Sequence, residues 1–192
     1  MIAIIKYNAG NISSVQNALE RLGYSSIVTD EPKLIQQAEK VIFPGVGEAS
    51  SAMKYLKEKG LDEVIKNLKQ PVLGICLGQQ LLCQFSEEGD TTCLGIFEAN
   101  VKKFEPKLKV PHMGWNNISG LNSELYNGIS NEEDFYFVHS YYTEICQETT
   151  AVCNYILPFS ASMQKDNFYV TQFHPEKSSN AGEQLLLNFL KL

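Results

Sequence analysis

The sequence predicts an α/β fold in which helices cover both faces of a mostly parallel central sheet, with extra antiparallel strands in the second half. In the first half, short apolar segments typical of strands alternate with amphipathic segments typical of helices, and the connections are short. Such alternation is the pattern of parallel strands joined by crossover helices. The 192 residues suffice for a full core and show no linker or repeat, so we expect residues 1–192 to form a single domain.

The first half is expected to hold the parallel strands and their connecting helices. An apolar face with helical period predicts a first helix through residues 15–22, which Asn11 or Ser13 can cap and Gly23 can end. Gly60 should divide a later helical stretch in two. The other expected elements are strands at 2–7, 26–29, 41–43 and 71–74, a short helix at 33–39, helices through 53–56 and 61–68, and a helix that begins at Leu77.

The second half is richer in segments typical of strands. One or two strands are expected at 95–104, followed by strands at 135–142, 151–156 and 168–173, and by a closing amphipathic helix at 184–192. Glycine, proline and asparagine punctuate residues 106–131, which we therefore expect to be the most loop-like stretch.

Composition narrows the class of protein. The net charge of −6 argues against a nucleic-acid partner, and no apolar run reaches the length of a membrane span. Residues 1–7 are too short and too soon charged for a signal peptide. The five cysteines form no Cys-x-x-Cys pair and show no zinc-ligand spacing, so we expect a reducing, cytoplasmic location and neither a metal nor a cofactor.

Cys76 has the surroundings of a reactive thiol. It lies between a predicted strand and a predicted helix, with Gly74 and Gly78 two residues away on either side. This spacing is the nucleophile-elbow pattern, in which glycines relieve crowding at a sharp turn. A helix N-terminus favours the thiolate, which is the nucleophilic form. The alternative is a buried structural cysteine beside two turn glycines.

His174 and Glu176 could complete a catalytic triad with Cys76. A thiol nucleophile needs a base, and His174 directly follows a predicted strand whose carboxyl end should share a sheet edge with Cys76. Glu176 can accept a hydrogen bond from the far imidazole nitrogen and orient the ring. Taken singly, the histidine could be a buried structural residue and the glutamate a solvated loop acid, but the coincidence of all three favours a triad.

These motifs resemble those of class I glutamine amidotransferases: Gly-Ile-Cys-Leu-Gly-x-Gln at 74–80, and His-Pro-Glu at 174–176. The resemblance implies a flavodoxin-like fold and hydrolysis of glutamine to glutamate and ammonia through a glutamyl thioester. The attack creates an oxyanion, which needs two N–H donors. We expect them from Leu77, the residue after the nucleophile, and from Val46 and Gly47 in the loop 44–47.

Within this family, further segments resemble the glutaminase subunits of imidazole glycerol phosphate synthases. The matching segments span nearly the whole chain in order: 7–11, 44–47, 110–116, 137–142 and 172–178. The resemblance implies a heterodimer with a (β/α)8-barrel cyclase that receives the ammonia and forms imidazole glycerol phosphate and aminoimidazole carboxamide ribonucleotide in histidine biosynthesis. A subunit of another synthase, or a catalytically silent paralogue that acts as a scaffold, are the alternatives.

The resemblance also implies roles for single positions. Glutamine contacts are expected from Gly47, Gln80, Glu88, His139, Ser140 and Tyr141. Contacts with the cyclase are expected from Asn11, Trp115 and Lys177, although Trp115 could be core and Lys177 merely solvated. Two positions depart from the family pattern: Lys6-Tyr7-Asn8 stands where Asp-Tyr-Gly is usual, and Gln79 where methionine is usual.

The oxyanion requirement implies a means of control. An isolated glutaminase would waste glutamine, so we expect the Gly45–Val46 peptide to adopt two orientations, only one of which aims an N–H at the oxyanion. Turnover should then be very low without the cyclase and its nucleotide.

Overall fold

The computed structural model describes residues 1–192 and confirms the α/β class. Its elements in chain order are β1 (Ile2–Ile5), α1 (Ile12–Arg21), β2 (Ser26–Thr29), α2 (Pro32–Gln37), β3 (Lys40–Phe43), α3 (Ala49–Glu58), α4 (Leu61–Lys66), β4 (Val72–Ile75), α5 (Leu77–Leu82), β5 (Cys83–Ser86), β6 (Thr91–Thr92), β7 (Phe97–Lys103), β8 (His112–Asn117), η1 (Glu124–Tyr126), β9 (Asp134–His139), β10 (Tyr141–Thr143), β11 (Thr149–Tyr155), β12 (Leu157–Lys165), β13 (Phe168–Thr171), η2 (Pro175–Lys177) and α6 (Ser179–Lys191), where η marks a short 3₁₀ helix.

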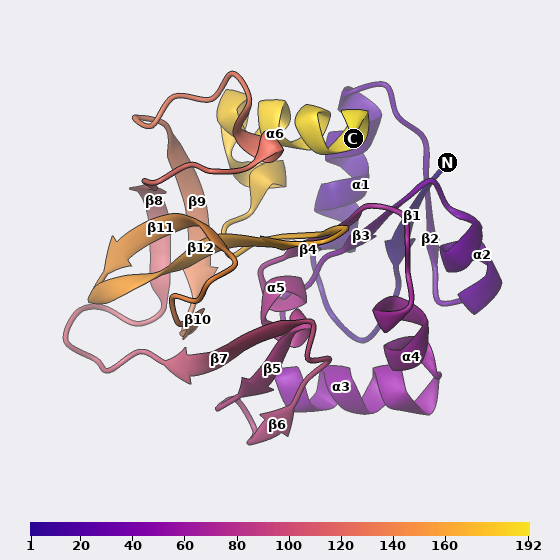
Figure 1. Ribbon diagram of the computed structural model, residues 1–192, viewed down its shortest axis with the longest axis horizontal. Coiled ribbons are helices and arrows are strands. Elements are labelled where there is room, and N and C mark those ends of the chain that lie inside the picture. The colour runs from indigo at the N-terminus through magenta and orange to yellow at the C-terminus, as the bar shows by residue number, and fades with distance from the viewer.

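A seven-stranded sheet in the order β11-β12-β13-β4-β3-β1-β2 forms the centre of the molecule (Figure 1). The strands from β13 to β2 are parallel, and β11 and β12 extend the sheet with antiparallel pairing. A four-stranded mixed sheet, β10-β7-β5-β6, and a two-stranded antiparallel sheet, β8-β9, complete the fold. The mostly parallel sheet with extra antiparallel strands is therefore as predicted.

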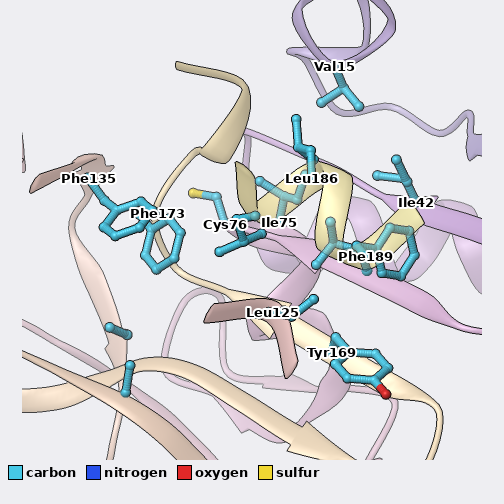
Figure 2. Close-up of a cluster of buried hydrophobic side chains, with 14 of the residues drawn as sticks. Val15, Ile42, Ile75, Cys76, Leu125, Phe135, Tyr169, Phe173, Leu186 and Phe189 are labelled. Atoms are coloured by element: carbon cyan, nitrogen blue, oxygen red, sulfur yellow. The ribbon is translucent and has the colours of Figure 1, made fainter. Parts of the chain in front are cut away.

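Helices cover both faces of the central sheet, as expected for buried parallel strands. Alternate residues of each strand point to opposite faces, so Ile4 joins the cluster under α1 and α6 while Ile5 joins the cluster under α3, α4 and α5. Figure 1 shows these two helical layers on opposite sides of the sheet. Figure 2 shows the cluster on the side of α6, with Cys76 beside Ile75 and towards Phe135 and Phe173.

The carboxyl ends of β4 and β13 meet at one edge of the sheet. The two strands are parallel neighbours, with Ile75 paired to Thr171. The backbone N–H of Cys76 donates to the carbonyl of Thr171 at 2.7 Å. The chain segments that follow the two strands, one with Cys76 and one with His174, therefore emerge side by side, as the sequence predicted.

The first half matches the predicted elements closely. Gly60 divides α3 from α4 with a φ of 65°, which glycine adopts without strain. One detail was wrong: Asn11 occupies the N-cap position of α1 in a left-handed conformation, yet its side chain makes no capping bond. The side chain reaches instead to Glu176 and His174, because tertiary partners replace the local one.

One expectation about the second half was wrong. Residues 135–142 do not form one strand, because the chain breaks at Ser140 and β9 and β10 join different sheets. Residues 106–131 are mostly turns and irregular structure, as expected, but they include β8 and η1. Strand β8 contains no β-branched residue, so its propensity is weak, and pairing with β9 along its whole length holds it extended.

Strands β5, β6 and β12 were not anticipated. Strand β12 contains Ser160 and Ser162 in a buried position, a pattern that does not indicate a strand from sequence. Their hydroxyls are satisfied by distant partners: Ser160 donates to the carbonyl of Glu144 at 2.8 Å, and Ser162 accepts from Tyr126 at 2.6 Å. Long-range hydrogen bonds thus make a polar sequence compatible with the sheet.

Candidate active site

Cys76 lies at the sharp turn from β4 into α5. Its φ of 54° and ψ of −104° place a non-glycine residue in a rarely occupied conformation, which proteins tolerate mainly at functional positions. Neither flanking position has room for a side chain. A Cβ on Gly78 would lie 1.9 Å from the carbonyl oxygen of Phe43, and one on Gly74 would lie 2.9 Å from a methyl carbon of Val170. The predicted nucleophile elbow is therefore present.

His174 and Glu176 form a buried pair after β13. His174 Nδ1 lies 2.8 Å from Glu176 Oε1, and both side chains are inaccessible to solvent. Asn11 Nδ2 donates to the same carboxylate oxygen. Since the carboxylate can only accept, Nδ1 carries the proton of the 2.8 Å bond, and the 3.3 Å approach of Asn11 Nδ2 to Nδ1 is a packing contact.

The other imidazole nitrogen is left free for the sulfur. His174 Nε2 is buried and has no hydrogen-bond partner within the chain. Burial lowers the pKa of His174, but the negative charge that Cys76 and Glu176 can carry outweighs burial and raises the pKa above its usual value. The imidazole is thus held in the orientation and electrostatic setting of a proton carrier between sulfur and substrate.

A cavity of about 260 Å³ opens beside the Cys76 turn. This volume suits a ligand the size of an amino acid better than a drug-sized molecule. It brings together all the residues that the sequence assigned to the oxyanion and to glutamine, and adds Pro111 and Val138, which the sequence reasoning missed. The lining residues are Val46, Gly47, Cys76, Leu77, Gln80, Glu88, Pro111, Val138, His139, Ser140 and Tyr141.

Glu88 and Gln80 are the two lining residues with side-chain carboxylate or amide groups. Glu88 Oε2 accepts the N–H of Ala49 at 2.9 Å, and burial of the half-buried carboxylate raises its pKa. Gln80 Nε2 donates to Tyr141 O and to Gln172 Oε1, each at 3.0 Å, so both hydrogens of the Gln80 amide are used. The remaining polar atom of Gln80, its Oε1, can therefore only accept a hydrogen bond.

The predicted oxyanion donors are not assembled in this conformation. The N–H of Leu77 donates to the carbonyl of Gly45 at 3.1 Å. The peptides on either side of that carbonyl are anchored, because Tyr7 donates its hydroxyl to Pro44 O at 2.6 Å and the N–H of Gly10 donates to Val46 O at 2.9 Å. The Gly45 carbonyl thus occupies the donor that an oxyanion would need.

The side chains of His139 and His112 form a buried hydrogen-bonded pair. His139 Nδ1 lies 2.7 Å from Tyr141 O, which can only accept, so His139 Nε2 accepts from His112 Nδ1 at 3.0 Å. Asn116 Nδ2 then donates to His112 Nε2 at 3.3 Å. Burial lowers the pKa of His112 to about 4 and that of His139 to about 3, so both rings stay neutral at pH 7.

The three residues expected to face a partner lie on segments that contact one another. Trp115 on β8 is 54% exposed and packs edge-on against Tyr136 of β9 at 5.9 Å. The N–H of His174 donates to Tyr136 O at 2.9 Å, which joins β9 to the segment that ends in Lys177. Asn11 contacts the buried pair of that segment. Met113, 57% exposed on the same face of β8, was missed by the sequence reasoning.

No helix is long and apolar enough to cross a membrane. No group of three or more His, Cys, Asp or Glu side chains is arranged to hold a metal ion.

Known proteins with similar sequences or folds agree on one protein family. The family model for "Glutamine amidotransferase class-I" matches residues 3–192. The imidazole glycerol phosphate synthase subunit HisH of Bacteroides fragilis is 59% identical over 100% of this chain and 99% of that protein. HisH 1 of Campylobacter jejuni is 48% identical over the full length of both.

Solved structures agree on the fold. One glutamine amidotransferase superposes with a TM-score of 0.74 at 18% identity, covering 100% of this chain and 98% of the other. PurLQS from Thermotoga maritima gives a TM-score of 0.74 at 14% identity, covering 99% and 97%.

Proposed function

The chain belongs to the class I glutamine amidotransferase family, and from this premise we propose that it is the glutaminase subunit of an imidazole glycerol phosphate synthase. The single observation that carries this is the buried His174–Glu176 pair, which leaves Nε2 unpartnered next to the Cys76 elbow at a cavity of amino-acid size. Relatives of that name align over the whole chain. We treat residues 1–192 as one amidotransferase domain and place it in the cytoplasm, where its five free cysteines stay reduced.

The reaction is acyl transfer through the sulfur of Cys76. The sulfur attacks the side-chain amide carbon of L-glutamine, an S–C bond forms, and the carbonyl electron pair moves to oxygen. His174 Nε2 carries the thiol proton to the amide nitrogen, so that the C–N bond breaks and ammonia leaves. Water then attacks the glutamyl thioester, the sulfur departs with the bonding pair, and glutamate is released.

Glu176 and Asn11 support the imidazole in this cycle. The carboxylate stabilises the imidazolium that forms during proton transfer and holds the tautomer in which Nε2 faces the sulfur. Asn11 donates to the same carboxylate oxygen and so fixes its orientation. Asn11, expected to face the cyclase, is therefore proposed to couple that face to the triad.

The cavity is proposed to hold glutamine by its polar ends. Glu88 supplies a carboxylate for the α-ammonium, and Gln80 Oε1 accepts a hydrogen bond from a substrate N–H. The backbone of His139, Ser140 and Tyr141 receives the α-carboxylate, and Gly47 contacts the substrate. Glu88→Gln should therefore raise KM much more than it lowers kcat, by about 10-fold or more for one lost charge-assisted bond.

The oxyanion is proposed to require a turn of the Gly45–Val46 peptide. In the present conformation Gly45 O occupies the N–H of Leu77, and the anchored carbonyls of Pro44 and Val46 leave only the intervening peptide to rotate. Rotation would free the Leu77 donor and aim the N–H of Val46 at the same point, while the N–H of Gly47 belongs to the anchored peptide and would keep its place. The isolated chain should therefore turn over glutamine very slowly, and full activity of the isolated chain would refute this control.

The ammonia is proposed to pass to a (β/α)8-barrel cyclase bound as a heterodimer. The cyclase forms imidazole glycerol phosphate and aminoimidazole carboxamide ribonucleotide in histidine biosynthesis. The face that carries Trp115, Lys177 and Asn11 is the proposed contact surface. Lys6, which stands where an acidic residue is usual, changes the charge at the same edge and should be matched by a change on the cyclase.

The test is co-purification with the cyclase followed by two assays. Glutamine hydrolysis is measured with and without the cyclase's nucleotide, and a sharp rise with nucleotide is expected. A Cys76→Ala complex should lose glutamine-dependent synthesis but keep synthesis from added ammonium salts. Retention of glutamine hydrolysis by that variant would overturn the role of Cys76.

A further inference from the structure

A buried glutamine, Gln172, contacts the sulfur of Cys76 and has no role in the triad. It directly follows β13, is fully buried, and places Nε2 at 3.6 Å from Cys76 Sγ. This separation is within the range of a hydrogen bond to sulfur. The backbone N–H of Gln172 donates to Ala161 O at 2.8 Å, which ties the residue to β12.

The direction of this contact follows from the neighbouring hydrogen bonds. Tyr141 O is a backbone carbonyl and can only accept, so the atom of Gln80 that lies 3.0 Å from it is the amide nitrogen. The same nitrogen lies 3.0 Å from the side chain of Gln172, which must present its oxygen there. The Gln172 amide therefore turns its N–H groups, and not its oxygen, toward the sulfur.

We propose that Gln172 is a further residue of the catalytic centre, which donates a hydrogen bond to the Cys76 sulfur and so favours the thiolate, and that Gln80 is the positioning residue that aims it. This rests on the proposed function, in which Cys76 is the nucleophile. The donor acts twice in the cycle. It stabilises negative charge on the sulfur before attack, and again when the sulfur leaves the thioester with the bonding pair.

The arrangement also links substrate binding to the nucleophile. Gln80 lines the glutamine cavity with its oxygen and holds Gln172 with its nitrogen. A substrate that draws Gln80 Oε1 toward itself pulls on the same amide that orients Gln172. Occupancy of the site is thereby coupled to the sulfur through the side-chain amides of Gln80 and Gln172.

Other groups also act on the sulfur, and Gln172→Met does not remove them. One is the backbone carbonyl of Val138, to which the Cys76 thiol donates at 3.9 Å. The His174 imidazole faces the sulfur from the segment after β13. Tyr7, two residues after β1, is the other titratable group that interacts with Cys76; its pKa is raised by burial and then by the charge on Cys76. A change in the thiol titration on replacing Gln172 can therefore be assigned to the lost donor.

The test compares two buried glutamines. Gln172→Met removes the donor to sulfur. Gln79→Met is the matched control, because Gln79 is equally buried and donates to Thr143 Oγ1 and Ser160 O but not to the sulfur. The full-length chain is alkylated with iodoacetamide across about pH 5 to 10, and modification of the Cys76 peptide is followed by mass spectrometry.

Gln172→Met should slow the alkylation of Cys76 about tenfold at neutral pH, the effect expected when one hydrogen bond to a charged group is lost. Gln79→Met should titrate like the wild type. The inference is overturned if Gln172→Met also titrates like the wild type, or if both variants shift equally. If Gln172→Met does not fold, NMR of the side-chain amide of Gln172 takes its place. In the wild type this amide resonance should shift with pH as Cys76 titrates, and in Cys76→Ala it should not. An amide resonance that ignores the titration would overturn the inference.

Failure of this inference is distinguishable from failure of the proposed function. If Cys76→Ala retained glutamine hydrolysis in the complex, the proposed function would fall. If Cys76→Ala were inactive and Gln172→Met titrated like the wild type, only the role of Gln172 would fall.

Discussion

Replacing Glu176 with glutamine tests the geometry of the triad most directly. Both hydrogen bonds to Glu176 arrive at one oxygen, from His174 Nδ1 at 2.8 Å and from Asn11 Nδ2, while Oε2 is buried without a partner. An amide of the same shape can place its oxygen at the first position and its NH₂ at the second. Because both neighbours donate hydrogen bonds, only the amide oxygen can accept at that position. We therefore expect the amide to keep this orientation and His174 to keep its tautomer.

The size of the effect follows from that orientation. Glu176→Gln then exchanges charge-assisted bonds for neutral ones at unchanged geometry, a loss of about 1 to 2 kcal/mol. This corresponds to about a 5- to 30-fold fall in kcat/KM. If the amide turned its NH₂ to Nδ1, the imidazole would take the wrong tautomer, and losses of about 10,000-fold are typical of that defect.

The assay is glutamine hydrolysis by the complex with cyclase and nucleotide, as a function of pH. The carboxylate raises the pKa of His174, so its loss should also move the alkaline limit of activity to lower pH. Asn11→Ala combined with Glu176→Gln is the control, because it removes one of the two demands on the oxygen and should allow the amide to turn. A loss above about 1,000-fold in the single variant, or no loss at all, would refute the reasoning.

Three further predictions follow from burial and space. Gly78→Ala should unfold or severely destabilise the chain, by about 3 kcal/mol or more in urea titrations, because its Cβ would lie 1.9 Å from the backbone oxygen of Phe43; near-wild-type stability would contradict the elbow geometry. The free energy of unfolding should fall as pH drops below about 6.5. In that range His112 and His139 bind protons in the unfolded chain but stay neutral in the folded chain, where their pKa values are about 4 and about 3. The loss should reach roughly 2 kcal/mol per histidine at pH 5, and His112→Gln should remove part of that pH dependence. Trp115→Ala should weaken binding of the cyclase by about 2 kcal/mol in calorimetry and leave the melting temperature of the chain unchanged, because the indole is 54% exposed.

Much of the first half could be predicted because local and tertiary preferences agree there. The strands up to β4 are short apolar runs and the helices have clear apolar faces, so periodicity alone located them. The second half was harder, since β8 contains no β-branched residue and β12 carries buried serines whose hydroxyls find their partners on other segments. Strand pairing of this kind is decided by neighbours and not by propensity.

Residue types and their spacing were enough to predict a thiol nucleophile between two glycines, a histidine and a glutamate after a later strand, and most of the residues around the cavity. A motif preserves such properties. How the atoms face one another depends on the folded chain. The tertiary structure brought Gln172 to the sulfur, placed Gly45 O on the N–H of Leu77, and turned Asn11 from a helix cap into a partner of Glu176. Hydrogen-bond direction depends on distances of a few ångströms between segments far apart in the chain, and such distances are set by packing of the whole fold.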